Sequence, residues 1–311
     1  MALISLKGIT PWLDGLLDIL GRYGVILHRS DCVPGSGGNI TVLLPRDVAA
    51  TVTSAAGAAG PEIGMDGLQD LGRESTQTGH YYRPDASVGP ILFSADLRVL
   101  HGRALLATVS GGKLSDLGRG DGKHLGVVAF SPDGRRARMI FGNVEHGTAP
   151  STEFASHVLA HAQNLAAGFS DSAVVHVHPP ALIDLSRHRE AGASFAAFNR
   201  LLYTQRPELV ANLPDLVGLI PYKAPGSGAL LEASSQAIAR HRAVVWRAHG
   251  VLIREKSVER CVDILEYVEA SAAAALRSLQ LLGALEPLSF DDVRHLVELY
   301  HLPKDILDLL S

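Results

Sequence analysis

The spacing of apolar residues changes along the chain, and its two kinds of pattern predict a mixture of helices and strands. Short apolar runs bounded by turn residues predict strands. They are found at residues 125–130, 138–141, 173–177, 217–220, 243–246 and 251–253. Apolar residues that recur every three or four positions predict amphipathic helices. Clear examples start near Thr10, Phe154 and Ser257, and the first half of the chain is expected to be mainly β.

Capping residues locate the starts of these helices. Thr10 followed by Pro11 predicts an N-cap and a first helical residue, with the helix ending at Gly21 or Gly24. Ser257 starts a long amphipathic helix, and Ser289 with Asp292 predicts a capping box. A helix from about residue 154 is expected to have Ser151 or Thr152 as its cap and Glu153 in its first turn.

The region before residue 142 contains the less regular part of the sequence. Residues 46–90 are rich in Ala, Gly and Thr with little periodicity, which indicates a peripheral insertion without chemistry. Residues 91–109 look like paired strands. The turn sequence at 131–134 predicts a hairpin between the strands at 125–130 and 138–141. No repeat or internal domain boundary is evident, so we expect one domain over residues 1–311.

Composition excludes several classes of function. The 311 residues are 47% hydrophobic, which is enough for a substantial core, and the formal net charge is −4 without a basic block. Only 5% are aromatic, so nucleic-acid binding is not expected.

Cys32 and Cys261 are too few for a disulfide framework. The N-terminal apolar segment is interrupted at Lys7, which argues against an export signal, and no run suits a membrane span. A cytoplasmic protein with a small-molecule partner is expected.

The apolar run at 173–177 is the candidate centre of the site. It contains His176 and is followed by His178 and two prolines. Because side chains alternate along a strand, His176 and His178 point to the same side and Val177 points to the other. Neutral imidazoles are common zinc ligands. The chain has 14 histidines, however, so a pair at this spacing is also expected by chance.

A third imidazole strengthens this hypothesis. His249 follows the apolar run at 243–246, so it too lies at the end of a predicted strand. Strand ends are where sites in α/β folds gather. Three protein ligands with one open position are typical of catalytic zinc. From the residues alone, a metal site formed by His176, His178 and His249 and a set of core or surface histidines both remain open.

Other polar residues offer weaker signals. Glu153 is explained by the helix dipole, which favours an acidic residue in a first turn, or by a role as general base or metal ligand. His157 and His161 are four residues apart on that helix but lack the metalloprotease pattern, so we interpret them as core or surface histidines. The glycine turn at 34–38 suits either an ordinary turn, which is favoured, or an anion-binding nest to which Asn39 could add a donor, and a second glycine turn lies at 110–112.

The order of these motifs resembles the class II aldolase/adducin family. They are the two glycine turns, the Pro-Ser-Thr-Glu sequence at 150–153, His-Val-His at 176–178 and the later His-Gly-Val at 249–251. The resemblance covers roughly residues 21–285 apart from the insertion and is greatest to rhamnulose-1-phosphate aldolases. It implies an α/β fold with a central, mainly antiparallel sheet flanked by helices. It also implies a homotetramer with sites at subunit interfaces.

The resemblance also implies roles for individual residues. His176, His178 and His249 match the zinc ligands, although manganese, iron or cobalt could replace zinc. Glu153 matches the catalytic glutamate, which exchanges a proton with the substrate carbon, and Glu208 matches a second acidic residue contributed across the interface. The residues matching the phosphate site are Ser36, Gly38, Asn39, Gly111, Gly112, Ser151 and Thr152.

The expected reaction is cleavage of a ketose 1-phosphate, in a rhamnose-type sugar pathway, to dihydroxyacetone phosphate and a hydroxyaldehyde such as lactaldehyde. In the family, zinc stabilises the enediolate that cleavage leaves. Ser36 and Gly111 depart from the Asn and Ser expected in the phosphate loops, so an unphosphorylated sugar is an alternative substrate. The sequence also leaves open sugar-phosphate 4-epimerisation, a Schiff-base aldolase using Lys113, and an adducin-like binding module without catalysis.

Overall fold

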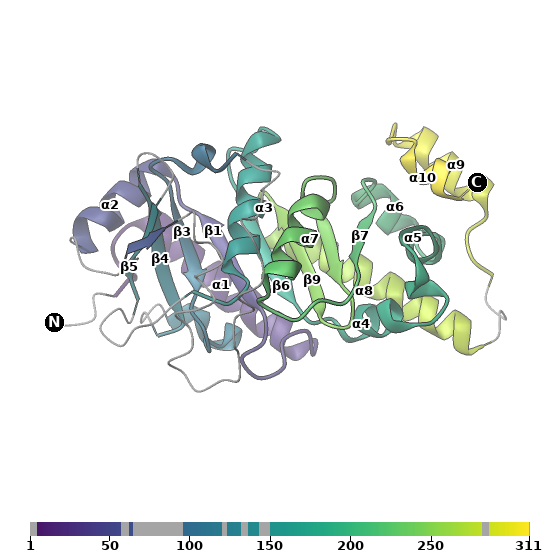
Figure 1. Cartoon of the computed structure of the whole chain (residues 1–311), viewed down its shortest axis with the longest axis horizontal. Coiled ribbons are helices and arrows are strands. Elements are labelled where there is room, and N and C mark those ends of the chain that lie inside the picture. The colour runs from purple at the N-terminus through teal and green to yellow at the C-terminus, as the bar shows by residue number, and fades with distance from the viewer. Residues whose placement is uncertain are drawn as a thin grey trace.

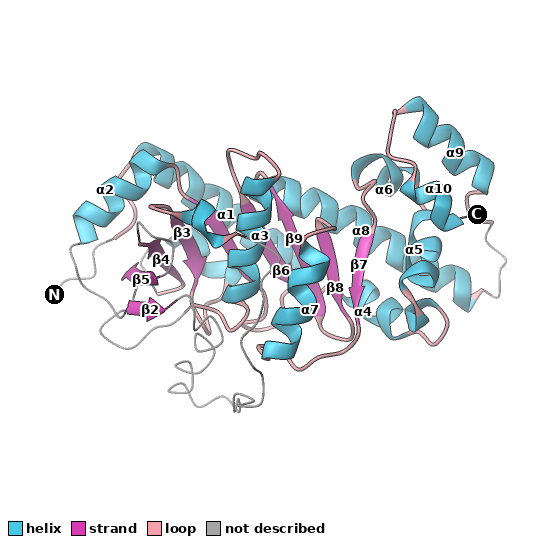
Figure 2. Cartoon of the chain, turned by 45° about the horizontal axis from the view of Figure 1, so that its top comes forward, coloured by secondary structure: helices cyan, strands magenta, loops and turns pink. Residues whose placement is uncertain are grey.

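The strands of the described residues form one nine-stranded sheet with helices on both faces (Figure 1, Figure 2). Its order is β2-β5-β4-β3-β1-β6-β9-β8-β7. Only β7 and β8 pair in parallel, which confirms the expected layered fold with a mainly antiparallel sheet. The computed structural model describes residues 5–56, 62–64, 96–119, 123–131, 136–142, 150–281 and 286–310.

The strands are short and mostly buried, as strands covered on both faces are. Their bounds are β1 (Asn39–Leu43), β2 (Glu62–Gly64), β3 (Ala104–Thr108), β4 (Leu125–Phe130), β5 (Arg136–Phe141), β6 (Ala173–Val177), β7 (Val217–Ile220), β8 (Ala243–Trp246) and β9 (Gly250–Glu255).

Two groups of helices cover the two faces of the sheet. On one face, α1 (Pro11–Arg29), α4 (Pro180–Arg187) and α8 (Val258–Gln280) share one hydrophobic cluster with the strands. On the other, α3 (Phe154–Ala166) and α7 (Gly228–Ile238) pack in two smaller clusters. Figure 1 shows α3 and α7 in front of the strands and α8 behind them.

Shorter helices extend both ends of the molecule. A helical group next to α8 consists of α5 (Phe195–Tyr203), α6 (Pro207–Asn212), α9 (Phe290–Leu299) and α10 (Asp305–Leu310). The remaining elements are α2 (Arg46–Ala56) and the 3-10 helices η4 (Leu97–Leu100), η5 (Leu114–Arg119) and η7 (Ala191–Ala193). No helix among the described residues is both long and apolar enough to cross a membrane.

Side chains of the central strand β6 point alternately to the two faces of the sheet. Val175 and Val177 are fully buried in the cluster with α8, while Val174 lies in the cluster with α7. Full burial of each valine contributes about 1.5–3 kcal/mol. His176 alternates with its neighbours and therefore lies on the α3 and α7 face, as its spacing predicts.

The antiparallel pairing brings several strand ends to one edge of the sheet. Asn39 begins β1 directly opposite His176 near the end of β6. Val177 pairs with Val251 near the start of β9, and Trp246 at the end of β8 pairs with Gly250. The loops that leave these strands therefore converge at this edge, which we call the site edge.

The first helix is longer than its glycines predict. Thr10 caps α1 as expected, but the helix continues through Gly21 and Gly24 to Arg29. A Cβ on Gly24 would overlap the carbonyl oxygen of Leu114, and one on Gly21 would lie 2.8 Å from the Cα of Gly118. The two glycines thus allow η5 to pack closely on α1, and they do not end the helix.

Other predictions were confirmed or corrected locally. Ser257 and Ser289 cap α8 and α9, and the predicted capping box is present. The cap of α3 is Glu153 itself, so Ser151 and Thr152 lie just before the helix and not at its cap. The helix starts at Phe154 as expected, but Glu153 lies at its cap and not in its first turn.

The strand predictions before residue 142 were partly right. β4 and β5 form the predicted hairpin, whose turn residues 132–135 lie outside the described part. Residues 97–100 form η4 and not a strand, whereas β3 is present. Of the expected insertion, α2 and β2 are described, and β2 pairs with β5 at one end of the sheet order. Residues 57–61 and 65–95 lie outside the described part.

Candidate metal centre and active site

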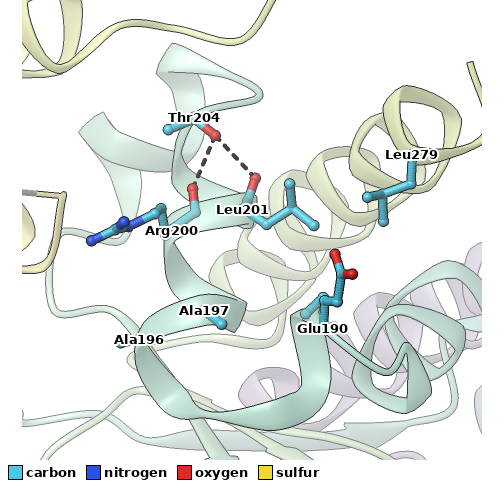
Figure 3. A pocket seen from close by; sticks show the side chains of 8 residues that line it. Glu190, Ala196, Ala197, Arg200, Leu201, Thr204 and Leu279 are labelled. Atoms are coloured by element: carbon cyan, nitrogen blue, oxygen red, sulfur yellow. Dashed lines mark hydrogen bonds between the residues drawn. The ribbon is translucent and has the colours of Figure 1, made fainter. Parts of the chain in front are cut away.

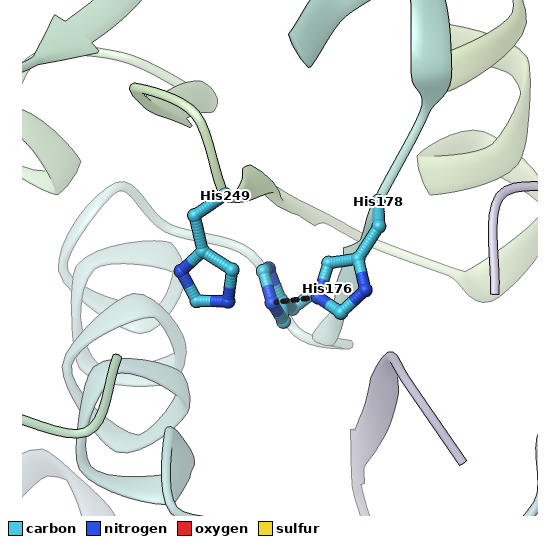
Figure 4. Close-up of side chains that lie close together, drawn as sticks. All are labelled: His176, His178 and His249. Carbon is cyan, nitrogen blue, oxygen red and sulfur yellow. Dashed lines mark hydrogen bonds between the residues drawn. The ribbon is translucent and has the colours of Figure 1, made fainter. Parts of the chain in front are cut away.

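Three imidazoles meet at the site edge. His176 lies on β6, His178 follows this strand, and His249 lies in the turn between β8 and β9. One candidate ligand atom from each ring lies within 4.8 Å of those of the other two. Figure 4 shows the three rings approaching one another from two separate segments of backbone. We call these residues the histidine triad.

The turn between β8 and β9 presents His249 to the other rings. The amide of His249 donates to the carbonyl of Trp246 at 2.9 Å, which closes a tight turn. Ala248 has a positive φ of 60°, which is uncommon for a residue with a Cβ. Its amide donates to the hydroxyl of Ser186 at 3.1 Å, so the structure around the turn holds this conformation.

His178 occupies a narrow slot between glycines. Its amide donates to the carbonyl of Cys32 at 2.7 Å. A Cβ on Gly37 would lie 2.9 Å from its Nδ1, and one on Gly250 would lie 2.8 Å from its Cδ2. Any side chain at either glycine would displace the ring. The glycine turn at 34–38 therefore has a steric function in addition to turning the chain.

Hydrogen bonding fixes the tautomer of His176. Its Nδ1 lies 3.0 Å from the carbonyl oxygen of Val251. Because a carbonyl oxygen only accepts, Nδ1 carries the proton and Nε2 carries the lone pair. That Nε2 lies 3.1 Å from Nε2 of His178. The ring of Trp246 packs at 4.5 Å from the His176 ring and covers it.

Burial keeps the triad neutral. It lowers the pKa of His176 well below its usual value, and the two neighbouring rings lower it further. Burial also lowers the pKa of His178 to about 4 and the pKa of His249 below its usual value. At neutral pH the three rings therefore offer uncharged nitrogens, which is the form that binds metals.

The triad fits a transition-metal ion such as zinc. A tetrahedral zinc with bonds of about 2.0–2.1 Å holds two ligand nitrogens about 3.3 Å apart, and His176 and His178 already match this spacing. Nδ1 of His249 is buried without a hydrogen-bond partner among the described residues. The two facing Nε2 atoms of His176 and His178 need a cation or a shared proton between them, because two lone pairs at this distance would repel each other.

Glu153 lies next to the triad. One carboxylate oxygen, Oε2, accepts hydrogen bonds from Ser151 Oγ at 2.8 Å and Asn39 Nδ2 at 3.2 Å. No hydrogen bond from the described residues reaches Oε1. The negative charge raises the pKa of His178 and His249, opposing the larger effect of burial. The carboxylate is thus held by one oxygen and has the other available for chemistry.

The glycine turns lie beside this carboxylate. Gly38 has a φ of 77° and is so close to β6 that a Cβ would lie 3.0 Å from the carbonyl oxygen of His176. Gly111 has a φ of 75° with open space around it. The amide of Gly112 donates to Val109, which bridges to Pro150 just before Ser151. These segments therefore converge at the site edge as a small open loop cluster.

The remaining predicted residues are more exposed. Ser36 is exposed on the first glycine turn, and Thr152 is half-buried before α3. Glu208 lies in the exposed first turn of α6, where its carboxylate makes no hydrogen bond or ion pair to a described residue. The chain itself thus does not bring Glu208 to the triad.

One residue near the site was not singled out from the sequence. The hydroxyl of Thr41 on β1 lies 2.8 Å from Nδ1 of His157 and 2.7 Å from Nε2 of His161. Both histidines are fully buried, which confirms the core interpretation and not a second metal pair. The available signals were Thr41, a polar residue between the apolar Ile40 and Val42, and two histidines four residues apart on one helix.

A separate cavity lies in the helical part of the molecule (Figure 3). It has a volume of about 450 Å³ and lies between α5, η7 and the end of α8. Its wall includes Glu190, Arg200 and several alanine and leucine side chains. The hydroxyl of Thr204 is already bonded to the carbonyls of Arg200 and Leu201. None of the residues predicted for the site lines this cavity.

Known structures share this fold. A sugar-phosphate aldolase from Thermotoga maritima aligns with a TM-score of 0.62 and 21% identity, over 87% of this chain and 97% of that one. An L-fuculose 1-phosphate aldolase aligns with a TM-score of 0.52 and 16% identity, over 92% and 96% of the two chains. At these identities the likeness shows the fold alone.

Sequence relatives identify the family. Rhamnulose-1-phosphate aldolase from Listeria monocytogenes serotype 4b (strain F2365) is 28% identical over 177 residues, which are 57% of this chain and 64% of that protein. The chain thus matches less than two thirds of this relative's length. The family described as "Class II Aldolase and Adducin N-terminal domain" matches residues 94–276, more than half of the chain. The chain therefore belongs to the class II aldolase and adducin family.

Proposed function

We propose that the chain is a metal-dependent class II aldolase. Its substrate is a ketose 1-phosphate similar to rhamnulose 1-phosphate, and its products are dihydroxyacetone phosphate and a hydroxyaldehyde such as lactaldehyde. The observation that carries the proposal is the meeting of three neutral imidazoles and Glu153 at one edge of the sheet. The relatives named rhamnulose-1-phosphate aldolase support the substrate class.

His176, His178 and His249 would hold the metal ion, and zinc suits three neutral imidazoles best. Class II aldolases are metal-dependent, which agrees with this set of residues. When bound, a divalent cation supplies a Lewis acid that stabilises negative charge on the sugar oxygens. The protein contributes the tautomer of His176 and the glycine slot around His178. Both features orient the rings before any ligand arrives.

Glu153 would handle the proton at the carbon that carries the developing charge. In the cleavage direction, the bond between the third and fourth carbons breaks and its electron pair stays with the ketone fragment. A base takes the proton of the fourth-carbon hydroxyl, and Glu153, protonated from solvent on Oε1, delivers a proton to the third carbon. The base then returns its proton to solvent, so the count of protons is restored. One proton thus moves from oxygen to carbon overall. Asn39 and Ser151 hold Oε2 of Glu153 so that Oε1 is available for the transfer.

Glu208 is proposed to act on the aldehyde side, from a neighbouring subunit of a homotetramer. Its exposed position on α6 suits contact with another subunit. A positioned carboxylate is a suitable base for the hydroxyl proton. This role makes the site complete only in the assembly, which we propose acts in the cytoplasm.

The phosphate would be bound by the loop cluster at the site edge. Gly38 and Gly111 allow backbone amides to approach an anion closely, while Gly112, whose own amide is bonded to Val109, allows the tight turn beside them. Side chains of the loop cluster contribute little to phosphate binding, because Gly111 has no side chain and that of Ser36 is short and exposed. Asn39, Ser151 and Thr152 are the other candidate donors. Backbone amides would therefore provide most of the affinity for the phosphate.

A retro-aldol assay tests the proposal. Purified protein is incubated with ketose 1-phosphates and with the matching free ketoses, and both the ketone and aldehyde products are measured. We expect aldehyde release from a phosphorylated ketose, loss of activity with EDTA, and recovery when zinc is added. Aldehyde release from free ketoses alone would replace the phosphorylated substrate with an unphosphorylated one.

The same assay separates the competing mechanisms. A diastereomer formed without free aldehyde would indicate a 4-epimerase on the same scaffold. Inactivation by borohydride in the presence of substrate, with no effect of EDTA, would indicate a Schiff base at Lys113. Absence of turnover with every sugar, from protein that holds its metal, would favour a binding module.

A further inference from the structure

Helix α3 contacts the sheet through a row of polar side chains. Glu153, His157, His161 and Asn164 lie four, four and three residues apart, so they share one face of the helix. His157, His161 and Asn164 are completely buried. A helix that packs on a sheet ordinarily presents apolar residues on this face. The row therefore has a role that apolar packing alone does not require.

The sheet presents a matching set of polar groups. Asn39 and Thr41 are two residues apart on β1 and so point to the same face. Asn39 bonds to Glu153 at 3.2 Å, and Thr41 bonds to both histidines at 2.8 and 2.7 Å. Successive residues on this face of the strand thus bond to residues on successive turns of the helix. We call these contacts the α3–β1 ladder.

The ladder continues beyond Thr41. The hydroxyl of Ser172, just before β6, lies 2.6 Å from Nδ1 of His161 and accepts from Asn164 Nδ2 at 2.9 Å. The amide oxygen of Asn164 accepts from Arg254 Nη1 at 2.8 Å. The row of bonds therefore runs without interruption from Arg254 on β9 to His157, one helical turn from Glu153.

Proton counting gives the ladder a direction. Both rings are neutral, because burial lowers the pKa of His157 to about 3 and that of His161 well below its usual value. Thr41 has one hydroxyl proton and can donate it to only one ring. If Ser172 donates to Nδ1 of His161, then Nε2 of His161 donates to Thr41 and Thr41 donates to Nδ1 of His157. Every hydroxyl proton then has an acceptor, and the one N–H without a partner among these described residues is Nε2 of His157. In the reverse direction the hydroxyl proton of Ser172 would have no acceptor among them.

We propose that Thr41 is a positioning residue, which through the α3–β1 ladder sets the location of the Glu153 carboxylate relative to the histidine triad. His176 lies opposite Asn39 in the sheet, so the strand that carries the first histidine of the triad pairs directly with the strand that carries the ladder. Glu153 is the N-cap of α3 and its carbonyl accepts from the amide of His157, so the bonds of Thr41 to His157 and His161 restrict where its backbone lies. The expected change in kcat rests on the proposed function. The expected position of the Glu153 carboxylate does not depend on activity.

The test replaces Thr41 in the full-length protein. Thr41→Val keeps the shape but removes the hydroxyl, whereas Thr41→Ser keeps the hydroxyl. We expect Thr41→Val to lower kcat by about 10- to 100-fold, because small displacements of a catalytic group have large effects. KM and the zinc content should stay within about threefold of the wild type, since the triad is untouched. Thr41→Ser should recover most of the lost kcat.

A matched control separates positioning from general loss of stability. Tyr203→Phe also removes a buried hydroxyl, which bonds to the carbonyl of Leu213 on the distant side of the molecule. It should lower the melting temperature without lowering kcat. If Thr41→Val does not fold, Ser172→Ala breaks the ladder farther from Glu153, and a smaller fall in kcat is expected. Wild-type kcat in the tested ladder variant would overturn the proposal.

A crystal structure of Thr41→Val supplies a readout that does not depend on turnover. The expected result is that Glu153 Oε2 moves out of hydrogen-bond range of Asn39 while the three imidazoles stay in place. An unmoved carboxylate would contradict the positioning role even if kcat falls. If the wild type itself cleaves no sugar, the proposed function is wrong, and the crystal structure still decides the role of Thr41.

Discussion

Asn39 Nδ2 donates a hydrogen bond to Glu153 Oε2 at 3.2 Å, across 114 positions of the chain. Asn39 is buried at the start of β1, and its Oδ1 has no partner among the described residues. The side-chain amide of Asn39 therefore donates one hydrogen bond to the Glu153 carboxylate, and its oxygen Oδ1 can still accept one. Asn39 thus supports the candidate base as well as being a candidate ligand of the substrate.

Removing this amide should reduce turnover. We expect Asn39→Ala to lower kcat by about tenfold or more, because Glu153 then keeps only the bond from Ser151. Ser151→Ala should have a comparable effect, and the double variant should lose less than the product of the two single losses, since both bonds act on one oxygen. Steady-state kinetics of the three variants measure this coupling. Independent, multiplicative losses would contradict a shared role.

Glu153 itself should be required for chemistry but not for metal binding. Glu153→Gln keeps the shape and can still accept a hydrogen bond, but it cannot transfer a proton at neutral pH. We expect kcat to fall by about 10²- to 10⁴-fold with unchanged metal content and melting temperature. Elemental analysis and stopped assays on the same preparation check both parts. A variant with full turnover would remove Glu153 from the mechanism.

Gly250 should be needed for the shape of the triad. A Cβ there would overlap the carbonyl oxygen of Val177 and lie 2.8 Å from His178 and 2.9 Å from His176. Gly250→Ala should therefore lower the free energy of unfolding by about 1–3 kcal/mol. It should also weaken metal binding by about tenfold or more, because two ligand rings are displaced.

The matched control for Gly250 is Gly15 on the exposed side of α1. A Cβ on Gly15 meets no atom within 4 Å. Gly15→Ala should raise the free energy of unfolding by about 0.5–1 kcal/mol, since alanine favours a helix. Urea unfolding and zinc titration of both variants make the comparison. Equal zinc affinity in Gly250→Ala and Gly15→Ala would show that the slot does not shape the triad.

The buried histidines of the ladder should make the fold sensitive to acid. The pKa of His157 falls from 6.5 to about 3 because of burial, so the unfolded chain binds a proton that the folded chain does not. The free energy of unfolding should then be highest above pH 6.5 and fall as the pH is lowered toward 3. The slope is about 1.4 kcal/mol per pH unit for each such group.

Urea unfolding at several pH values between 7 and 4.5 measures this slope. His157→Asn should reduce it by about 1.4 kcal/mol per pH unit. The control is His295→Asn, because His295 is exposed on α9. The slope of this control is the reference for a histidine that is not buried. Equal slopes in the wild type and His157→Asn would show that His157 does not cause the acid sensitivity.

The part of the site that follows local rules was predictable from the sequence. His176 and His178 are two residues apart in a strand, so the sequence alone places them on one side. Thr10, Ser257 and Ser289 are N-caps whose bonds reach only three residues along the chain. Such predictions succeed because the interacting groups are close in sequence.

The part that depends on distant contacts was not predictable in this way. That His249 reaches His176 depends on the pairing of β6 with β9, and the ladder depends on α3 lying over β1. Gly21 and Gly24 looked like helix ends because the packing of η5 on α1 cannot be read from the helix sequence. Tertiary contacts there override the local preference of glycine.

The metal content of purified protein tests the central claim most directly. Wild-type protein, His249→Ala and the exposed control His295→Ala are prepared in parallel and analysed for zinc, manganese, iron and cobalt. We expect one divalent metal ion per chain in the wild type and the control, and a loss of most of it in His249→Ala. Stoichiometric metal in His249→Ala, or none in wild-type protein reconstituted with each metal, would contradict the assignment of the histidine triad as the metal site.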